Sequence, residues 1–179
     1  IGELAAGRRF LNLFAYTGTA TVYAVGGGAT GATTVHMSNT YLDWARRNLA
    51  LTDLAGPDHG FVHADCIAWL EEQARDGGQR YGLVFVDPPT LSRSKRMERE
   101  FDVQRDHVQL LRMVAALLEP DGVIVFSNNY QRFKLDAEAL AEFEVQDLSR
   151  KTLPEDFRRN PRIHVAYSLR RKAARVAGG

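Results

Sequence analysis

The segment Gly82-Leu83-Val84-Phe85-Val86-Asp87-Pro88-Pro89-Thr90 contains the strongest predicted β-strand of the chain. From Gly82 to Val86 it has no polar side chain, as expected of a strand that is buried on both faces of a sheet. It ends at Pro88-Pro89, because proline cannot continue in the interior of a sheet. Such a strand is typical of a parallel sheet with helices on both faces.

Shorter strands and helices alternate on either side of this segment. Further strands are expected at 8–14, 33–37, 60–64, 123–127, 143–148 and 163–169. Helices are expected at 19–25, from Ser38 or Asn39 to the turn at 55–58, and at 65–75, 103–118 and 136–142, with a type I turn at 119–122. Alternating strands and helices with right-handed crossovers predict a doubly wound α/β fold. Ligands of such folds bind beyond the carboxyl ends of the strands.

Length and composition suit one globular domain spanning residues 1–179. Apolar residues make up 45% and charged residues 25%, which disfavours disorder, collagen and coiled coil. The single Cys66 excludes an internal disulfide framework, the His residues show no metal-ligand spacing, and no apolar run is long enough to cross a membrane. We expect no metal site and a cytoplasmic location. The chain begins Ile1-Gly2-Glu3 without an initiator Met, so we expect a fragment of a longer protein.

Charge is uneven along the chain, although the net charge is only +1. Between Arg150 and Arg175 nine Lys and Arg side chains face two acidic ones. A basic segment on a mildly acidic body indicates either an anionic partner or a solvated face. The loop after the central strand carries Arg93, Lys95 and Arg96 beside serines, which suits either phosphate contacts or a plain solvated loop.

The loop after the first expected strand disfavours dinucleotides. Asn12-Leu13-Phe14-Ala15-Tyr16-Thr17-Gly18 has one glycine before the following helix, not the three of a dinucleotide fingerprint. The chain also has no Walker lysine motif. NAD-linked and NTP-linked functions are therefore disfavoured.

Other strand ends carry side chains with two possible roles. His36-Met37-Ser38 either bonds ribose hydroxyls through His36 or simply ends a strand. Asp65-Cys66 either caps a helix through Asp65 or meets an adenine amino group. Ser127-Asn128-Asn129 either contacts a heterocycle through its amides or ends a strand. Cys66 has no recognisable base beside it, which disfavours a nucleophilic role.

Asp87-Pro88-Pro89 is the most informative of these strand ends. The prolines remove two amide donors and leave a carboxylate with a row of carbonyl oxygens. Such a site accepts hydrogen bonds from an amino-bearing planar base and tolerates a nearby positive centre. The alternative is a strand end closed by a rigid loop.

Together these motifs resemble class I S-adenosylmethionine (SAM) methyltransferases. More closely, the chain is similar from about Arg9 to Leu169 to the C-terminal methyltransferase domain of the RlmKL family, the bifunctional 23S rRNA guanine methyltransferases. The similarity is carried by residues 12–20, 37–45, 64–66, 87–90, 94–98, 101–107, 126–129, 151–157 and 163–164. It implies a Rossmann-like fold with a mostly parallel seven-stranded sheet, helices on both faces and a final antiparallel strand.

The resemblance also implies SAM as cofactor, S-adenosylhomocysteine (SAH) as product and methyl transfer to guanine N7 of 23S rRNA or a large-subunit precursor. Expected catalytic residues are Asp87, Pro88, Pro89 and Asn128. Cofactor binding is expected at Asn12, Phe14, Ala15, Tyr16, Thr17, Gly18, His36, Met37, Ser38, Asp65, Cys66 and Asp87, and RNA binding at Arg93, Lys95 and Arg96. Fused N-terminal THUMP and guanine-N2 methyltransferase domains are expected in the full-length protein, and no membrane association.

One departure and several alternatives stay open at this point. Members of the family carry Asp where this chain has His36, which weakens the expected ribose contact. A cytosine-C5 methyltransferase is disfavoured, since the segment after the fifth strand is Ser127-Asn128-Asn129 and has no Cys. The residues also permit a small-molecule or other-base N-methyltransferase. A non-catalytic RNA-binding module with a decayed cofactor site is a further alternative.

Overall fold

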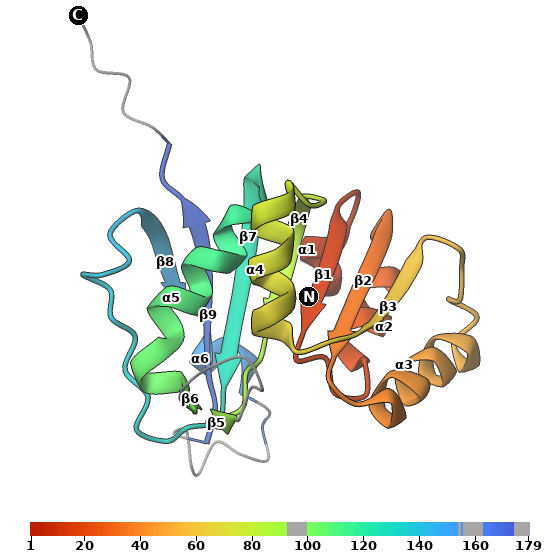
Figure 1. Cartoon of the computed structure of the whole chain (residues 1–179), viewed down its shortest axis with the longest axis horizontal. Coiled ribbons are helices and arrows are strands. Elements are labelled where there is room, and N and C mark those ends of the chain that lie inside the picture. The colour runs from red at the N-terminus through yellow and green to blue at the C-terminus, as the bar shows by residue number, and fades with distance from the viewer. Residues whose placement is uncertain (93–99, 154, 156–162, 174–179) are drawn as a thin grey trace, which may run out of the picture.

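The computed structural model describes residues 1–92, 100–153, 155 and 163–173, and Figure 1 shows its elements. Seven strands form one sheet: β1 (Arg9–Leu13), β2 (Gly31–His36), β3 (His59–His63), β4 (Tyr81–Val86), β7 (Leu118–Asn128), β8 (Phe143–Asp147) and β9 (Val165–Arg171). The helices are α1 (Gly2–Ala5), α2 (Thr19–Gly26), α3 (Asn39–Leu51), α4 (Cys66–Asp76), α5 (Val103–Ala116) and α6 (Ser149–Thr152). A two-stranded ribbon joins β5 (Leu91–Ser92) to β6 (Phe101–Asp102).

The sheet has the order β3-β2-β1-β4-β7-β9-β8 and confirms the predicted fold class. Strand β4 pairs in parallel with β1 and with β7, as its apolar sequence predicts for a central strand. The final strand β9 runs antiparallel to both β7 and β8. The first residues of β9 therefore lie at the same edge of the sheet as the carboxyl ends of the parallel strands.

Alternate side chains of the central strands enter two separate cores. Leu11, Val84 and Phe126 belong to the larger core, which α4 and α5 cover. Phe10 and Leu83 belong to the smaller core, which α1 and α2 cover. Figure 1 shows α4 and α5 in front of the sheet and α1 and α2 behind it. Helices on both faces are thus confirmed.

Two predicted helix ends are confirmed and one predicted ion pair is wrong. The Asp65 side chain caps α4 by accepting hydrogen bonds from the amides of Ile67 and Ala68, at 3.1 and 3.0 Å. Helix α2 ends at Gly26, in the run of three glycines at 26–28 that is expected to stop it. On α3, the spacing of four residues predicts that Asp43 pairs with Arg47. Asp43 instead pairs with Arg46, at 2.9 Å.

Residues 119–122 form an irregularity inside β7 where we expected a separate turn. The β4–β7 register runs from Tyr81 opposite Leu118 to Leu83 opposite Val123, so the intervening residues of β7 bulge out of the ladder. Pro120 has no amide hydrogen for the ladder, which suits a bulge.

The helix expected at 136–142 is a series of turns instead. The amides of Ala141 and Phe143 bond three residues back, to the Glu138 and Leu140 carbonyls at 3.3 and 2.9 Å, as in turns. Partners from other elements bind carbonyl groups in the second half of the segment. Arg112 of α5 donates to the Ala139 carbonyl at 2.7 Å. Lys172, just after β9, donates through Nζ to the Ala141 carbonyl at 2.7 Å and through its amide to the Glu142 carbonyl at 3.0 Å.

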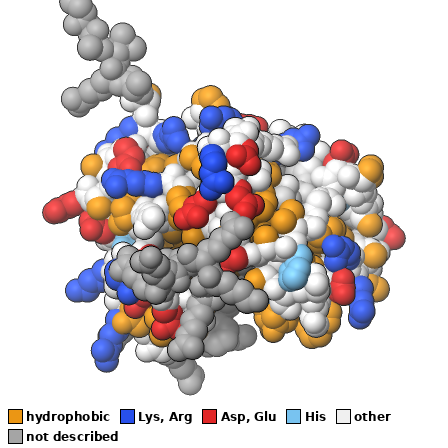
Figure 2. All heavy atoms as spheres, in the orientation of Figure 1, with side chains coloured by type: hydrophobic (Ala, Val, Ile, Leu, Met, Phe, Trp, Pro, Cys, Tyr) orange, Lys and Arg blue, Asp and Glu red, His pale blue; other side chains and the backbone are white. Residues whose placement is uncertain are grey.

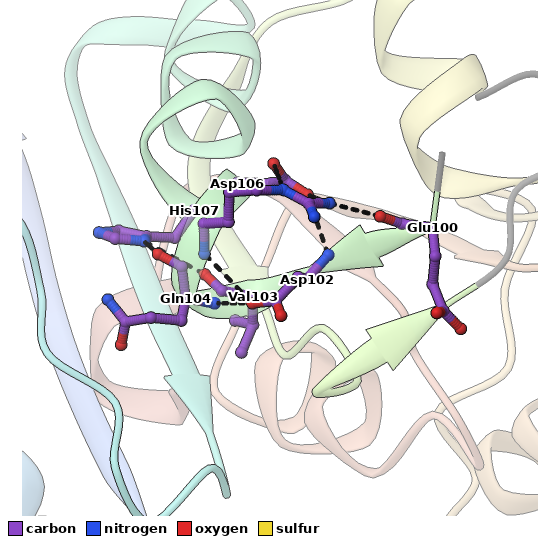
Figure 3. A network of polar contacts seen from close by, with 7 residues as sticks. Glu100, Asp102, Val103, Gln104, Asp106 and His107 are labelled. Carbon is purple, nitrogen blue, oxygen red and sulfur yellow. Dashed lines mark hydrogen bonds and ion pairs between the residues drawn. The ribbon is translucent and has the colours of Figure 1, made fainter. Parts of the chain in front are cut away.

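A polar network fixes the start of α5 next to the β5–β6 ribbon (Figure 3). Asp102 caps the helix by accepting from the amides of Gln104 and Arg105, at 2.9 and 3.2 Å. The buried Asp106 carboxylate accepts from the Asp102 amide and from the Arg105 guanidinium, at 2.9 and 2.7 Å. The Val103 amide donates to the Thr90 carbonyl at 3.0 Å. The segment that leaves the Pro88-Pro89 strand end is thereby held against the body of the domain.

Candidate functional site

One cavity of about 490 Å³ opens at the carboxyl edge of the sheet. Five parallel strands and the start of β9 contribute to it, as the topology requires. Its volume lies within the range of about 300–1,000 Å³ that is usual for ligand sites. The lining residues are Phe14, Tyr16, His36, Met37, Asp65, Cys66, Ile67, Phe85, Asp87, Pro88, Pro89, Ser92, Ser127, Asn128, Asn129 and His164.

The loop after β1 reaches the cavity through strained backbone. Phe14 and Tyr16 have positive φ angles of 57° and 48°, which non-glycine residues adopt rarely and mostly at functional sites. The Phe14 amide donates to Cys66 Sγ at 3.2 Å and so ties this loop to α4. Ala15, Thr17 and Gly18 belong to the same loop but do not line the cavity.

Asn12 points into the core between the sheet and α2, away from the cavity. Its Nδ2 donates to Thr21 Oγ1 at 2.9 Å, and Thr21 Oγ1 lies 2.9 Å from Thr34 Oγ1. All three side chains are fully buried. Asn12 precedes the strand end, so its side chain points into one face of the sheet. The structure therefore does not bring Asn12 into the expected cofactor site.

His36 lines the cavity as a hydrogen-bond donor. The Ser38 amide donates to His36 Nδ1 at 3.0 Å, so the proton of the neutral imidazole lies on Nε2. Burial, and to a lesser degree nearby His63, lowers the pKa of His36 below its ordinary value of 6.5. His36 thus offers an N–H where an aspartate would offer acceptor oxygens. Ser38 itself does not line the cavity.

Asp65 and Cys66 lie on the cavity wall at the start of α4. Asp65 is the helix cap already described, and the geometry permits it to act both as a cap and as a cavity residue. Burial is the main cause that raises the pKa of the Cys66 thiol to about 12. Cys66 is therefore a protonated thiol at neutral pH, which disfavours a nucleophilic role as predicted.

Asp87 follows β4 at the centre of the cavity edge, beside Pro88 and Pro89. Ser127 donates from Oγ to Asp87 Oδ1 at 2.8 Å. Burial raises the pKa of Asp87 above its ordinary value, while the Ser127 hydrogen bond and the charge of His164 act in the opposite direction. The second carboxylate oxygen, Oδ2, is left for a ligand.

Asn128 brings a buried amide to the same wall. Its Oδ1 accepts from the Tyr130 amide at 3.0 Å. Its Nδ2 is buried and has no hydrogen-bond partner among the described residues, an arrangement that calls for a ligand or a bound water. The structure thus brings Asp87, the two prolines and Asn128 together, as the sequence predicted.

Sequence reasoning missed His164, which lines the cavity from the chain just before β9, next to the end of β7. The expected site residues all follow strands, whereas His164 precedes β9, and an antiparallel strand presents its first residues at this edge. The predicted antiparallel orientation was the signal that pointed to it. Other lining residues absent from the prediction are Ile67, Phe85 and Ser92, while Ser127 and Asn129 belong to the strand end that was expected to contact a heterocycle or to end the strand.

The basic residues that the structure describes between 150 and 171 lie in two separate places. Arg150 and Lys151 lie on α6, near the start of β9 and the cavity edge. Arg170 and Arg171 lie at the far end of β9, about 20 Å away for a strand of this length. On the face shown in Figure 2, basic and acidic side chains are interspersed. Arg93, Lys95 and Arg96 lie outside the described residues.

Among the described residues, no group of three or more His, Cys, Asp or Glu side chains is placed to hold a metal ion. The described helices include none that is long and apolar enough to cross a membrane.

Comparisons with known proteins agree with this site. The chain is 60% identical over 169 residues to a ribosomal RNA large subunit methyltransferase K/L from Methylococcus capsulatus, covering 94% of this chain and 23% of that protein. The corresponding protein from Allochromatium vinosum is 56% identical with the same coverage. The chain thus spans about a quarter of the length of these relatives.

A crystal structure of a protein described as a methyltransferase, in complex with SAH, superposes with a TM-score of 0.78 at 24% identity, covering 93% of this chain and 47% of that one. This likeness confirms the fold. The family model for S-adenosylmethionine-dependent methyltransferases matches residues 1–154. With the cavity in the position that this fold uses for its cofactor, the chain belongs to the S-adenosylmethionine-dependent methyltransferase family.

Proposed function

We propose that this chain is the methyltransferase domain of an rRNA-modifying enzyme and transfers a methyl group to guanine N7 of 23S rRNA. The names of the relatives support rRNA as the substrate class. The observation that carries the proposal is one continuous cavity, which runs from His36 and Asp65 at one end to Asp87 and Asn128 at the other. Such a cavity can hold a cofactor and an acceptor base in contact.

The described residues fit SAM. We assign the end lined by His36, Met37, Asp65 and Cys66 to the adenosine, with the His36 Nε2–H donating to a ribose hydroxyl. We assign the loop 14–18 to the methionine part. SAM supplies an electrophilic methyl group on a sulfonium. Apolar side chains such as Phe14 and Ile67 exclude water from the cavity.

Asp87 and the Pro88-Pro89 carbonyl groups would hold the N–H groups of the acceptor base. Guanine N7 has an in-plane lone pair, so no residue has to remove a proton before transfer. Catalysis then depends on alignment of that nitrogen at about 3–3.5 Å from the methyl carbon. Methylation at N7 leaves a positive charge on guanine, which the Asp87 carboxylate stabilises.

The rest of the proposed enzyme lies outside this chain. We propose that a longer protein carries an RNA-binding THUMP module and a guanine-N2 methyltransferase, and that the enzyme acts in the cytoplasm. Arg93, Lys95 and Arg96 are proposed to contact phosphates that flank the acceptor base.

The test is methyl transfer from labelled SAM to undermethylated 23S rRNA, with the product nucleoside identified by mass spectrometry. We expect N7-methylguanosine, and a loss of about 100-fold or more in Asp87→Ala with the fold retained. Asp76→Ala, at the end of α4 remote from the cavity, is the matched control. Near-normal transfer by Asp87→Ala would refute the role of Asp87. N2-methylguanosine as product would reassign the position, and absence of SAH binding in calorimetry would indicate a decayed site.

A further inference from the structure

His164 faces the acceptor end of the cavity from a strand that the family's cofactor loops do not use. It immediately precedes β9, whose first residue Val165 pairs with Asn128 of β7. It lines the cavity together with Asp87, Ser127 and Asn128.

The hydrogen bonds of Thr152 fix the orientation of the His164 ring. Thr152 Oγ1 lies 3.0 Å from the Leu148 carbonyl oxygen and 2.9 Å from His164 Nε2. A carbonyl only accepts, so the single hydroxyl proton of Thr152 goes to Leu148. His164 Nε2 must therefore donate to Thr152. In the neutral imidazole, the nitrogen left for a ligand is Nδ1, which is an acceptor.

The polar atoms left over at this end of the cavity form a defined pattern. Asp87 Oδ1 is occupied by Ser127, which leaves Oδ2 as an acceptor. Asn128 Oδ1 is occupied by the Tyr130 amide, which leaves the buried Nδ2 as a donor. Among the described side chains, Asp87 Oδ2 and His164 Nδ1 are thus two acceptors available to a base at this end of the cavity.

This pattern matches the Watson–Crick edge of one standard base. Guanine offers two donors, N1–H and the N2 amino group, and one acceptor, O6. Adenine, cytosine and uracil each offer a single donor group on that edge. Resting on the function proposed above, we propose that His164 selects guanine by accepting a hydrogen bond from its N2 amino group, beside Asp87 on N1–H. N7, on the opposite edge of the base, is left free for the methyl group.

The order of the strands supports this assignment. The cofactor loop follows β1, Asp87 follows β4, and His164 lies beyond β7, so His164 is the farthest of the polar residues from the cofactor loop. The N2 amino group is likewise the atom of guanine most distant from N7.

Two conservative variants separate the two nitrogens of the ring. The amide of His164→Asn places a polar atom near the Nδ1 position, and that of His164→Gln places one near the Nε2 position. We expect His164→Gln to lose about 10- to 100-fold in kcat/KM for RNA, as for loss of a base-specific hydrogen bond. His164→Asn should lose only a few-fold. SAH affinity and the Tm should stay unchanged in both, and His59→Gln at the opposite edge of the sheet is the matched control.

An RNA with inosine at the target position tests the assigned contact directly, because inosine lacks only the N2 amino group. The wild-type chain should prefer guanosine over inosine by about 10-fold or more, and His164→Gln should lose this preference. A guanosine preference retained in His164→Gln would overturn the proposal. Equal losses of kcat/KM in His164→Asn and His164→Gln, together with a similar fall in Tm, would also overturn it, because they would indicate a purely structural role. If the wild-type chain methylates no RNA, the proposed function itself fails, and this inference fails with it.

Discussion

At the scale of single residues, Asp87 combines a functional position with a cost in stability. Burial raises its pKa, so the folded state binds a proton more readily than the unfolded state. For such a carboxyl group, stability falls as the pH rises from the ordinary pKa of 3.8 through the raised value. We therefore expect Asp87→Asn to raise the Tm at pH 7 while it abolishes methyl transfer.

The same argument makes the gain in Tm depend on pH. Below about pH 3.8 the carboxyl group is protonated in both states, and the difference between wild type and Asp87→Asn should vanish. Thermal unfolding of both proteins between pH 3.5 and 8 measures this, with about 2–4 °C expected for each 1 kcal/mol in a chain of this size. A gain in Tm that is independent of pH would contradict the explanation.

Cys66 gives a second residue-scale prediction, since it is the only thiol in the chain. Its side chain is 4% exposed, and its pKa is raised from 9.0 to about 12. At pH 8 the thiolate fraction should fall about 1,000-fold on folding, and alkylation by iodoacetamide should slow at least as much. Rates with and without urea measure this, and Cys66→Ser gives the background. Equal alkylation rates in the folded and the unfolded protein would show that the start of α4 opens readily and exposes Cys66 to solvent.

At the scale of elements, Gly18 sets how closely α2 approaches α3. Its φ is +73°, and a Cβ there would lie 2.4 Å from Ala45 Cβ. Gly7 has a similar φ of +69°, with nothing within 4 Å of a Cβ. Gly7→Ala should therefore cost only the conformational term of about 1–2 kcal/mol in unfolding free energy. Gly18→Ala should cost about 1–3 kcal/mol more through overpacking.

Urea unfolding of the two alanine variants isolates the packing contribution, because the backbone conformations match. The variant Gly18→Ala should also weaken SAH binding, since the loop that lines the cavity lies between β1 and α2. Equal losses of unfolding free energy in Gly7→Ala and Gly18→Ala would mean that α3 can move away from residue 18 without loss of stability.

Features that depend on neighbouring residues could be predicted from the sequence, whereas features that depend on distant partners could not. The apolar run of β4 and the Asp65 cap depend on local signals, and both were predicted correctly. The helix expected at 136–142 is a series of turns, whose carbonyl groups are bound by Arg112 and Lys172, and neither partner is adjacent in sequence. His164 was missed for a related reason, because its relation to Asp87 exists only once β9 is placed beside β7.

At the scale of the whole molecule, the described residues of the basic segment lie at two distant edges of the sheet. Strand β8 ends near the cavity and leads into α6, so Arg150 and Lys151 are exposed beside the acceptor end. Arg170 is exposed at the opposite end of β9, and Arg75 in the last turn of α4 lies at that same edge. If RNA enters over the acceptor end, Arg150 and Lys151 contact phosphates, whereas Arg75 and Arg170 do not.

The salt dependence of RNA binding tests this division. Each phosphate contact contributes about 0.7 to the slope of log K against log salt for a single strand. Replacing Arg150 and Lys151 by Gln should therefore reduce the slope by about 1.4 and weaken binding most at low salt. Replacing Arg75 and Arg170 by Gln removes the same charge and should leave the slope unchanged. Equal reductions would mean that RNA responds only to the net charge of the domain, and the path of the RNA over α6 would then have to be abandoned.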